Sequence, residues 1–263
     1  MASVVDRAIS LGASGYTFST HSTNYEILKT LKSNRFEKSF TLNPVIPYAE
    51  GYIRTSNEKG MTGILTELMS RLTVAAKARA LIQGGISALS MDPVKMLKAY
   101  VDIELEGYLN VRPDNARLGC VLLHEVISDL SLSFRLERLF RSFIEHAHDK
   151  HRVKAGFVTR NFAKFVEYFE TLGIPWDQFV IMTPFNGIGA QMIPSKASCE
   201  AALSKIADCE VIAMSPLAAG YLRIPEALEY ISSLHKLTGV AIGVSTLEHA
   251  DDTFTRFRSL LSA

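Results

Sequence analysis

The sequence is poor in the features that mark several classes of protein. Its 263 residues include three cysteines, Cys120, Cys199 and Cys209, too few and too scattered for a disulfide framework or a zinc ribbon. Lysine and arginine total 28 against 27 aspartate and glutamate residues, so the net charge is only +1. This balance lacks the basic surplus of nucleic-acid-binding proteins, and no nucleic-acid partner is expected.

Long hydrophobic runs are also missing. No apolar stretch reaches the roughly 18 residues of a membrane span. The most apolar segment, residues 80–91, is shorter and follows Lys77 and Arg79. The N-terminus has no charged segment followed by an apolar run, so no signal peptide is expected. With few cysteines, these features predict a cytoplasmic protein that does not engage a membrane.

What the sequence does contain is a repeated unit, clearest in its last third. Apolar runs at 211–214 and 240–244 stop at the small polar residues Ser215 and Ser245, and a helical segment follows each run. Runs this short, with helices between them, are typical of parallel strands covered on both faces. A hydrophobic content of 48% supplies enough apolar side chains for one large core.

The same unit recurs along the chain. Seven strands are predicted, at residues 15–19, 39–42, 118–123, 155–158, 179–182, 211–214 and 240–244. They indicate an α/β fold, a parallel (β/α) TIM-type barrel, in a single domain over residues 1–263. The second strand should end at Asn43-Pro44, because proline cannot donate a hydrogen bond into a central ladder.

Residues 60–108 interrupt this rhythm. Met61, Ile64 and Leu65 lie on one helical face, and Asp92-Pro93 is a typical helix start. The segment therefore predicts a helical insertion with a wide apolar stripe. We expect it either to cover the open face of the barrel or to form the contact of a homo-oligomer.

Four stretches resemble the aldo-keto reductase barrel, a superfamily of NADP-dependent oxidoreductases: VLLH at 121–124, GFVTRN at 156–161, SPLAAG at 215–220 and IGVST at 242–246. In this alignment residues 4–11 correspond to the family's first helix, and the family's first strand would precede Met1. The resemblance implies a barrel in which residues 15–19 either pair with 240–244 or face a gap where that strand would sit.

The family's catalytic tetrad, an aspartate, a tyrosine, a lysine and a histidine, is mostly missing. Only His124 matches; the aspartate would fall at residues 19–20 and the lysine at 42–43, where neither type occurs. Tyr48 is a candidate tyrosine outside the family's motif context. Ser245 and its neighbour replace the basic residue that would hold the cofactor's 2′-phosphate. We therefore expect weak or no NADPH binding, and the sequence leaves the cofactor unknown.

Polar residues at the strand ends form the candidate site, because these ends meet on one rim of a barrel. The catalytic candidates are His124, Glu125, His21 and Tyr48, with His124 as general acid or base. The ligand-binding candidates are Asn43, Arg160, Asn161, Asn186, Ser215 and Ser245. Arg160 is the best cation for an anionic ligand. His124, Glu125 and His21 lack the tight spacing of a metal site, so none is predicted.

A histidine cluster at 146–151 is interpreted as a solvated helix end that the helix dipole favours. Three functions remain open. The first is a small-molecule enzyme or ligand-binding barrel with a polar rim and His124 as acid or base. The second is an NAD(P)H-dependent oxidoreductase with a rearranged site. The third is a non-catalytic barrel used for binding or assembly.

Overall fold

The computed structural model describes residues 1–33, 36, 39–47 and 92–261 of the chain. Tyr48 and residues 60–91 of the predicted insertion lie outside this part. No helix among the described residues is long and apolar enough to cross a membrane.

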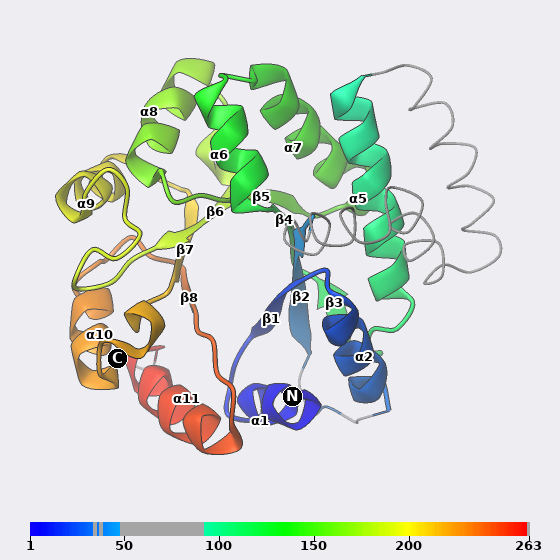
Figure 1. The fold of residues 1–263 in the computed structure, drawn as a ribbon, viewed down its shortest axis with the longest axis vertical. Helices are drawn as coiled ribbons and strands as arrows, with labels where there is room; N and C mark the ends of the chain where they lie inside the picture. The colour runs from blue at the N-terminus through cyan, green and yellow to red at the C-terminus, as the bar shows by residue number, and fades with distance from the viewer. Residues whose placement is uncertain (34–35, 37–38, 48–91, 262–263) are drawn as a thin grey trace, which may run out of the picture.

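The core of the molecule is a nearly closed barrel of parallel strands with helices around it (Figure 1). The strands run in the order β1 (Gly15–Ser19), β2 (Phe40–Ile46), β4 (Cys120–Leu123), β5 (Lys154–Val158), β6 (Phe179–Pro184), β7 (Glu210–Met214) and β8 (Gly239–Ala241). Each hydrogen-bonded pair along this path is parallel. The predicted α/β barrel with seven strands is therefore confirmed.

The helices alternate with the strands and form the outer layer. They are α1 (Ala2–Ser10), α2 (Ser22–Leu31), α5 (Pro93–Leu109), α6 (Glu125–Ser133), α7 (Glu137–His151), α8 (Phe162–Leu172), α9 (Lys196–Lys205), α10 (Ile224–Ser232) and α11 (Leu247–Leu261). Short 3-10 turns occupy Trp176–Gln178 and Ala218–Gly220. Side chains cap several helix starts; Asp92, for example, accepts a hydrogen bond from the Val94 amide, as its place before Pro93 predicted.

The predicted end of the second strand is wrong, because β2 continues through Pro44 to Ile46. The strand beside β2 is interrupted where the proline falls: β3 (Ala116–Leu118) ends and β4 begins around Gly119. Leu42 pairs with Leu118 but Val45 pairs with Leu122, so the partner has one extra residue there. Proline is tolerated at such a bulge because the ladder hydrogen bond it cannot donate is already interrupted.

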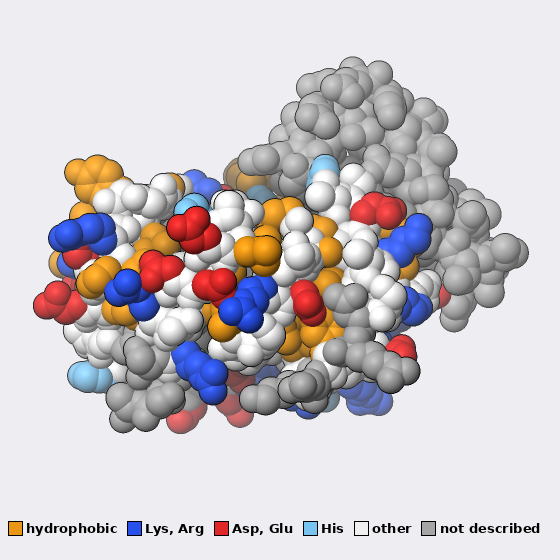
Figure 2. All heavy atoms as spheres, turned by 90° about the horizontal axis from the view of Figure 1, so that it is seen from below, with side chains coloured by type: hydrophobic (Ala, Val, Ile, Leu, Met, Phe, Trp, Pro, Cys, Tyr) orange, Lys and Arg blue, Asp and Glu red, His pale blue; other side chains and the backbone are white. Residues whose placement is uncertain are grey.

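The barrel does not close between β1 and β8. These two strands are the ends of the described sheet and do not pair with each other. Helices α1 and α11 lie side by side next to this gap, with an ion pair between Arg7 and Asp251 (Figure 1). The gap is one of the two arrangements that the family resemblance implied. Figure 2 shows charged side chains of both signs intermixed with hydrophobic ones on the side where these helices lie.

The main core lies between the sheet and its helices and is rich in phenylalanine. Phe157 of β5 is fully buried and meets Phe140, Phe165 and Phe169 of α7 and α8 at ring distances of 5.3, 5.6 and 5.7 Å. Burial of one such ring contributes about 1.5–3 kcal/mol. This aromatic layer packs α7 and α8 against the central strands of the sheet.

Inside the barrel the two sides differ. Buried apolar side chains fill the lumen along β4 and β5: Leu122 and Val158 belong to one cluster, whose Val180 and Met182 on β6 border the cavity. Along β1, β2 and β8 the alternating positions that face the cavity are small or polar instead: Gly15, Thr17, Thr41, Asn43, Gly239 and Ala241. The interior is therefore packed on one side and hollow on the other.

Candidate functional site

The hollow side of the lumen forms a cavity of about 1010 Å³. Its walls come from α1, from residues of each strand from β1 to β8 and from the segment after β8, together with Phe254 of α11. The far wall is apolar, with Val180, Met182, Ile212 and Met214. Since this volume lies next to the gap between β1 and β8, the missing closure of the barrel and the cavity are parts of one feature.

Asn43 supplies the central polar group of the cavity wall. Its Oδ1 accepts a hydrogen bond from the Cys120 amide at 3.2 Å, and its Nδ2 donates to Thr41 Oγ1 at 3.5 Å. Gly119 makes this contact feasible, because a Cβ there would lie 2.3 Å from Asn43 Oδ1. Asn43 thus satisfies the amide at the interruption between β3 and β4 and also lines the cavity.

Cys120 is the thiol on the cavity wall. Burial raises its pKa to about 12, and the negative charge of Glu210 acts in the same direction. The thiol therefore stays protonated near neutral pH, where a cysteine nucleophile would need to be a thiolate. Cys120 contributes volume and a weak donor to Asn43 Oδ1, at an Sγ to Oδ1 distance of 3.5 Å.

Charged side chains surround the end of the cavity near the strand N-termini. Arg117, Arg152, Lys154 and Glu210 are all lining residues. Lys154 Nζ and Glu210 Oε1 form an ion pair at 2.7 Å. Three cations and one carboxylate give these four side chains a net charge of +2, which favours the approach of an anion.

Ser215 is a predicted rim residue that lines the cavity, at the end near the strand C-termini. It follows β7 and has a positive φ of 54°, which is uncommon for a residue other than glycine. Its carbonyl accepts a hydrogen bond from the Ala218 amide at 3.0 Å, which begins the tight turn at 218–220. Such strained positions cluster at ligand-binding sites, and this one turns the chain at the cavity edge.

The histidines of the rim cap helices. His124 Nδ1 accepts a hydrogen bond from the Val126 amide at 3.2 Å, and His21 Nδ1 accepts one from the Thr23 amide at 3.1 Å. An accepting Nδ1 places the proton of a neutral imidazole on Nε2. Each ring therefore presents an N–H donor rather than a base on its other nitrogen.

Glu125 and Arg160 pair with each other at the rim. The Arg160 amide also donates to Asp129 Oδ2 at 3.2 Å, and the buried Thr159 hydroxyl donates to Oδ1 of the same carboxylate. Glu125 therefore neutralises the cation predicted to attract an anionic ligand. Many of the polar groups on the rim between β4 and β5 are therefore already hydrogen-bonded or ion-paired within the protein.

The remaining candidates occupy separate places. Asn186 is fully buried and exchanges two hydrogen bonds with the Ala190 backbone, at 2.8 and 2.9 Å, which shapes the loop after β6. Asn161 precedes α8 without a side-chain cap bond, and Ser245 is exposed before α11. None of these three lines the cavity.

Of the candidates predicted from the sequence, the structure places Asn43 and Ser215 on the cavity, whereas His21, His124, Glu125 and Arg160 lie outside its lining. Tyr48 is outside the described residues. Sequence reasoning missed Thr17, Thr41 and Arg117. The signal for the two threonines was the alternation of small and polar residues in the first two strands, which places them on the inner face with a period of two.

Comparison with known proteins supports the fold alone. No family model matches the chain, and no curated protein matches it. Among the similar solved structures is one with a TM-score of 0.52 and 14% sequence identity, over 97% of this chain and 78% of the other. It is the crystal structure of Gox0644 in its apo form. At this identity the similarity is evidence for a shared barrel and carries no activity.

Proposed function

We propose that this protein binds a small polar molecule with an anionic group in the open side of its barrel. The observation that carries the proposal is the cavity of about 1010 Å³, at the upper end of the range for small-molecule sites. Thr17, Thr41 and Asn43 offer hydrogen-bonding groups on its wall. The four charged side chains near the strand N-termini favour an anion.

His124 is the one residue that matches the catalytic tetrad of the aldo-keto reductases, which the sequence resembles. Because Nδ1 accepts from the Val126 amide, the neutral ring carries its proton on Nε2, so neither nitrogen is set up as a base. Glu125 is engaged by Arg160 and His21 caps α2, so the structure supports His124 as a hydrogen-bond donor better than as a base. A nicotinamide-dependent reaction has little support, because the family's aspartate and lysine are missing.

The experiment compares a variant that fills the cavity with one that changes the rim. A Cβ on Gly239 would meet only Ile212 Cγ1, at 3.7 Å, so Gly239→Leu extends a side chain into the cavity. Ser245→Leu is the matched control, because Ser245 is exposed and outside the lining. Ligand-observed NMR with phosphate monoesters, small carboxylic acids and neutral polyols measures binding to each.

We expect the anionic compounds to bind the wild type and the S245L variant, and to lose binding to the G239L variant. Binding that survives in G239L and disappears in S245L would move the site to the rim. A panel without any anionic binder would contradict the proposal. Addition of NADPH should give weak or no binding, and tight binding would favour the oxidoreductase alternative.

In the part of the chain that the structure describes, the unpaired edges of β1 and β8 favour a second candidate function: a non-catalytic barrel that binds an extended segment of a protein partner. Within the described sheet, β1 and β8 each have a strand on one side only. Edge strands of this kind can pair with an added strand. Hydrogen exchange separates the two candidates, because an added strand would protect the β1 and β8 amides, whereas a small molecule in the lumen would not.

A further inference from the structure

The histidine cluster near the end of α7 is not solvated as the sequence suggested. His146 and His151 side chains are only 14% and 12% exposed, and both contact Asp102 of α5, itself 14% exposed. His148, by contrast, is 75% exposed and contacts only the exposed Asp149 among the interactions of the described residues. The interpretation as a solvated helix end therefore holds for His148 and is wrong for the other two histidines.

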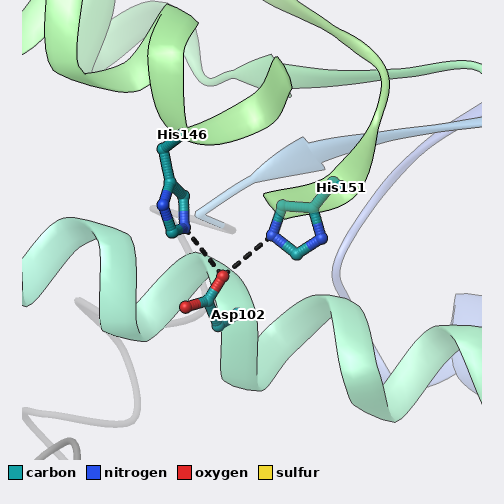
Figure 3. Close-up of side chains that lie close together, drawn as sticks. All are labelled: Asp102, His146 and His151. Atoms are coloured by element: carbon teal, nitrogen blue, oxygen red, sulfur yellow. Dashed lines mark hydrogen bonds and ion pairs between the residues drawn. The ribbon is translucent and has the colours of Figure 1, made fainter. Parts of the chain in front are cut away.

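The rings of His146 and His151, both partly buried, converge on a single oxygen atom. His146 Nε2 and His151 Nε2 each lie 2.8 Å from Asp102 Oδ1, and Figure 3 shows both rings directed at that oxygen. The ring centroids are 5.5 Å apart with planes at 81°. The ligand atoms of the three residues all lie within 4.8 Å of one another. Small movements would bring all three within coordination distance of one ion.

We propose that Asp102, His146 and His151 bind a divalent transition-metal ion, for which Zn²⁺ is the first probe. Two imidazoles and one carboxylate are a donor set that suits zinc and related ions, and three protein ligands leave a fourth position for water. The spacing of His146 and His151, with four residues between them, falls within the range that zinc-binding histidine pairs use. The ion would replace the two N–H protons that now face Asp102, with each neutral ring carrying its proton on Nδ1 instead.

Lys150 defines how the carboxylate can act. Its Nζ lies 2.6 Å from Asp102 Oδ2, the oxygen that neither histidine contacts. This leaves Oδ1 for the metal, so Asp102 would coordinate through one oxygen while Lys150 holds the other. Because the ligands come from α5 and α7, the ion would link two neighbouring helices and fix α5 against the barrel.

The test uses the whole chain and starts with the wild type. Equilibrium dialysis should give one Zn²⁺ per chain, and Zn²⁺ should raise the Tm because it binds only the folded state. Co²⁺ should give a d–d spectrum without a thiolate charge-transfer band, since all three cysteines are buried and none belongs to this cluster. Absence of stoichiometric binding by the wild type, or a thiolate band, would overturn the proposal without any variant.

Variants then assign the site. H146Q, H151Q and D102N should each weaken Zn²⁺ binding by at least about 100-fold, because even outer partners of metal ligands typically contribute 10–100-fold. H148Q is the matched control from the same helix and should bind as the wild type does. Equal zinc affinity in H148Q and H146Q would contradict the assignment, as would loss of binding in H148Q alone. If one ligand variant does not fold, by circular dichroism, the other two and the wild-type spectrum still decide.

Discussion

The two sides of the barrel lumen have the same backbone arrangement and opposite interiors. Along β4 and β5, large apolar side chains such as Leu122 and Val158 meet and fill the space, as in other barrels of this type. Along β8, β1 and β2, residues such as Gly15, Thr17 and Gly239 leave a cavity of about 1010 Å³. The difference shows that strand pairing sets the barrel, whereas side-chain size at alternate positions decides where it is solid.

This comparison separates stability from function. The packed side should lose stability when a side chain is shortened or added, because its atoms have no room to adjust. The hollow side should tolerate such changes and should instead govern access of small molecules.

Leu122→Ala should destabilise the protein by about 2–5 kcal/mol, since it removes a fully buried side chain from the packed interior, away from the cavity lining. Urea unfolding followed by circular dichroism measures the change. Thr17→Ala on the hollow side is the comparison and should change the free energy of unfolding by less than about 0.5 kcal/mol. Similar losses in both variants would remove the distinction between the two sides.

Gly156→Ala should destabilise by about 1–3 kcal/mol, because the added Cβ would lie 2.3 Å from Leu122 Cδ2. Leu122 is fully buried in the packed interior and cannot easily move aside. The same urea experiment applies. A neutral result would mean that the packed side has more room than its side chains indicate.

Gly239→Ala should have the opposite sign. The new Cβ would approach only Ile212, at 3.7 Å, an ordinary contact, so the variant should gain about 0.4–1 kcal/mol by restricting the unfolded chain. The two glycines both lie in barrel strands, and only their surroundings differ. A loss of stability in G239A comparable to that of G156A would show that the hollow side is more tightly packed than the cavity indicates.

The smallest effect concerns pH. The folded-state pKa of Cys120, raised to about 12 by burial, exceeds its ordinary value of 9.0. A raised pKa contributes stability that is fully present below the unfolded value and is lost as the pH rises toward the folded value. Unfolding free energy should therefore fall by about 0.4 kcal/mol from this group between pH 8 and 9, and faster above it. Cys120→Ala should remove that share of the slope; an unchanged slope would show that the thiol is already solvated.

The sequence was sufficient to predict the barrel, because short apolar runs alternating with helices have few other parallel arrangements. It also identified two residues of the cavity wall as site candidates: Asn43, which belongs to β2, and Ser215, which follows β7. It could not reveal the continuation of β2 through Pro44, since that depends on a bulge in a distant partner strand around Gly119.

The histidines illustrate the same limit. His124 lies at a strand end, as expected, but its capping bond to Val126 depends on a local geometry that spacing does not fix. His146 and His151 are shielded because Asp102, over 40 residues earlier, lies between them. Periodicity predicts which face of an element is buried, whereas contacts between distant polar residues depend on how the elements pack.

We expect small polar molecules, anions above all, to enter the hollow side of the lumen. The most direct measurement is the labelling rate of Thr17→Cys with methanethiosulfonate reagents of either charge, since Thr17 lines the cavity and the native cysteines are all buried. We predict that the cysteine of this variant reacts far faster than Cys120, and faster with the anionic reagent than with the cationic one. Salt should reduce the difference between the two reagents, because it screens the charges of Arg117, Arg152 and Lys154. Labelling as slow as that of Cys120 would contradict this prediction, as would a preference for the cationic reagent.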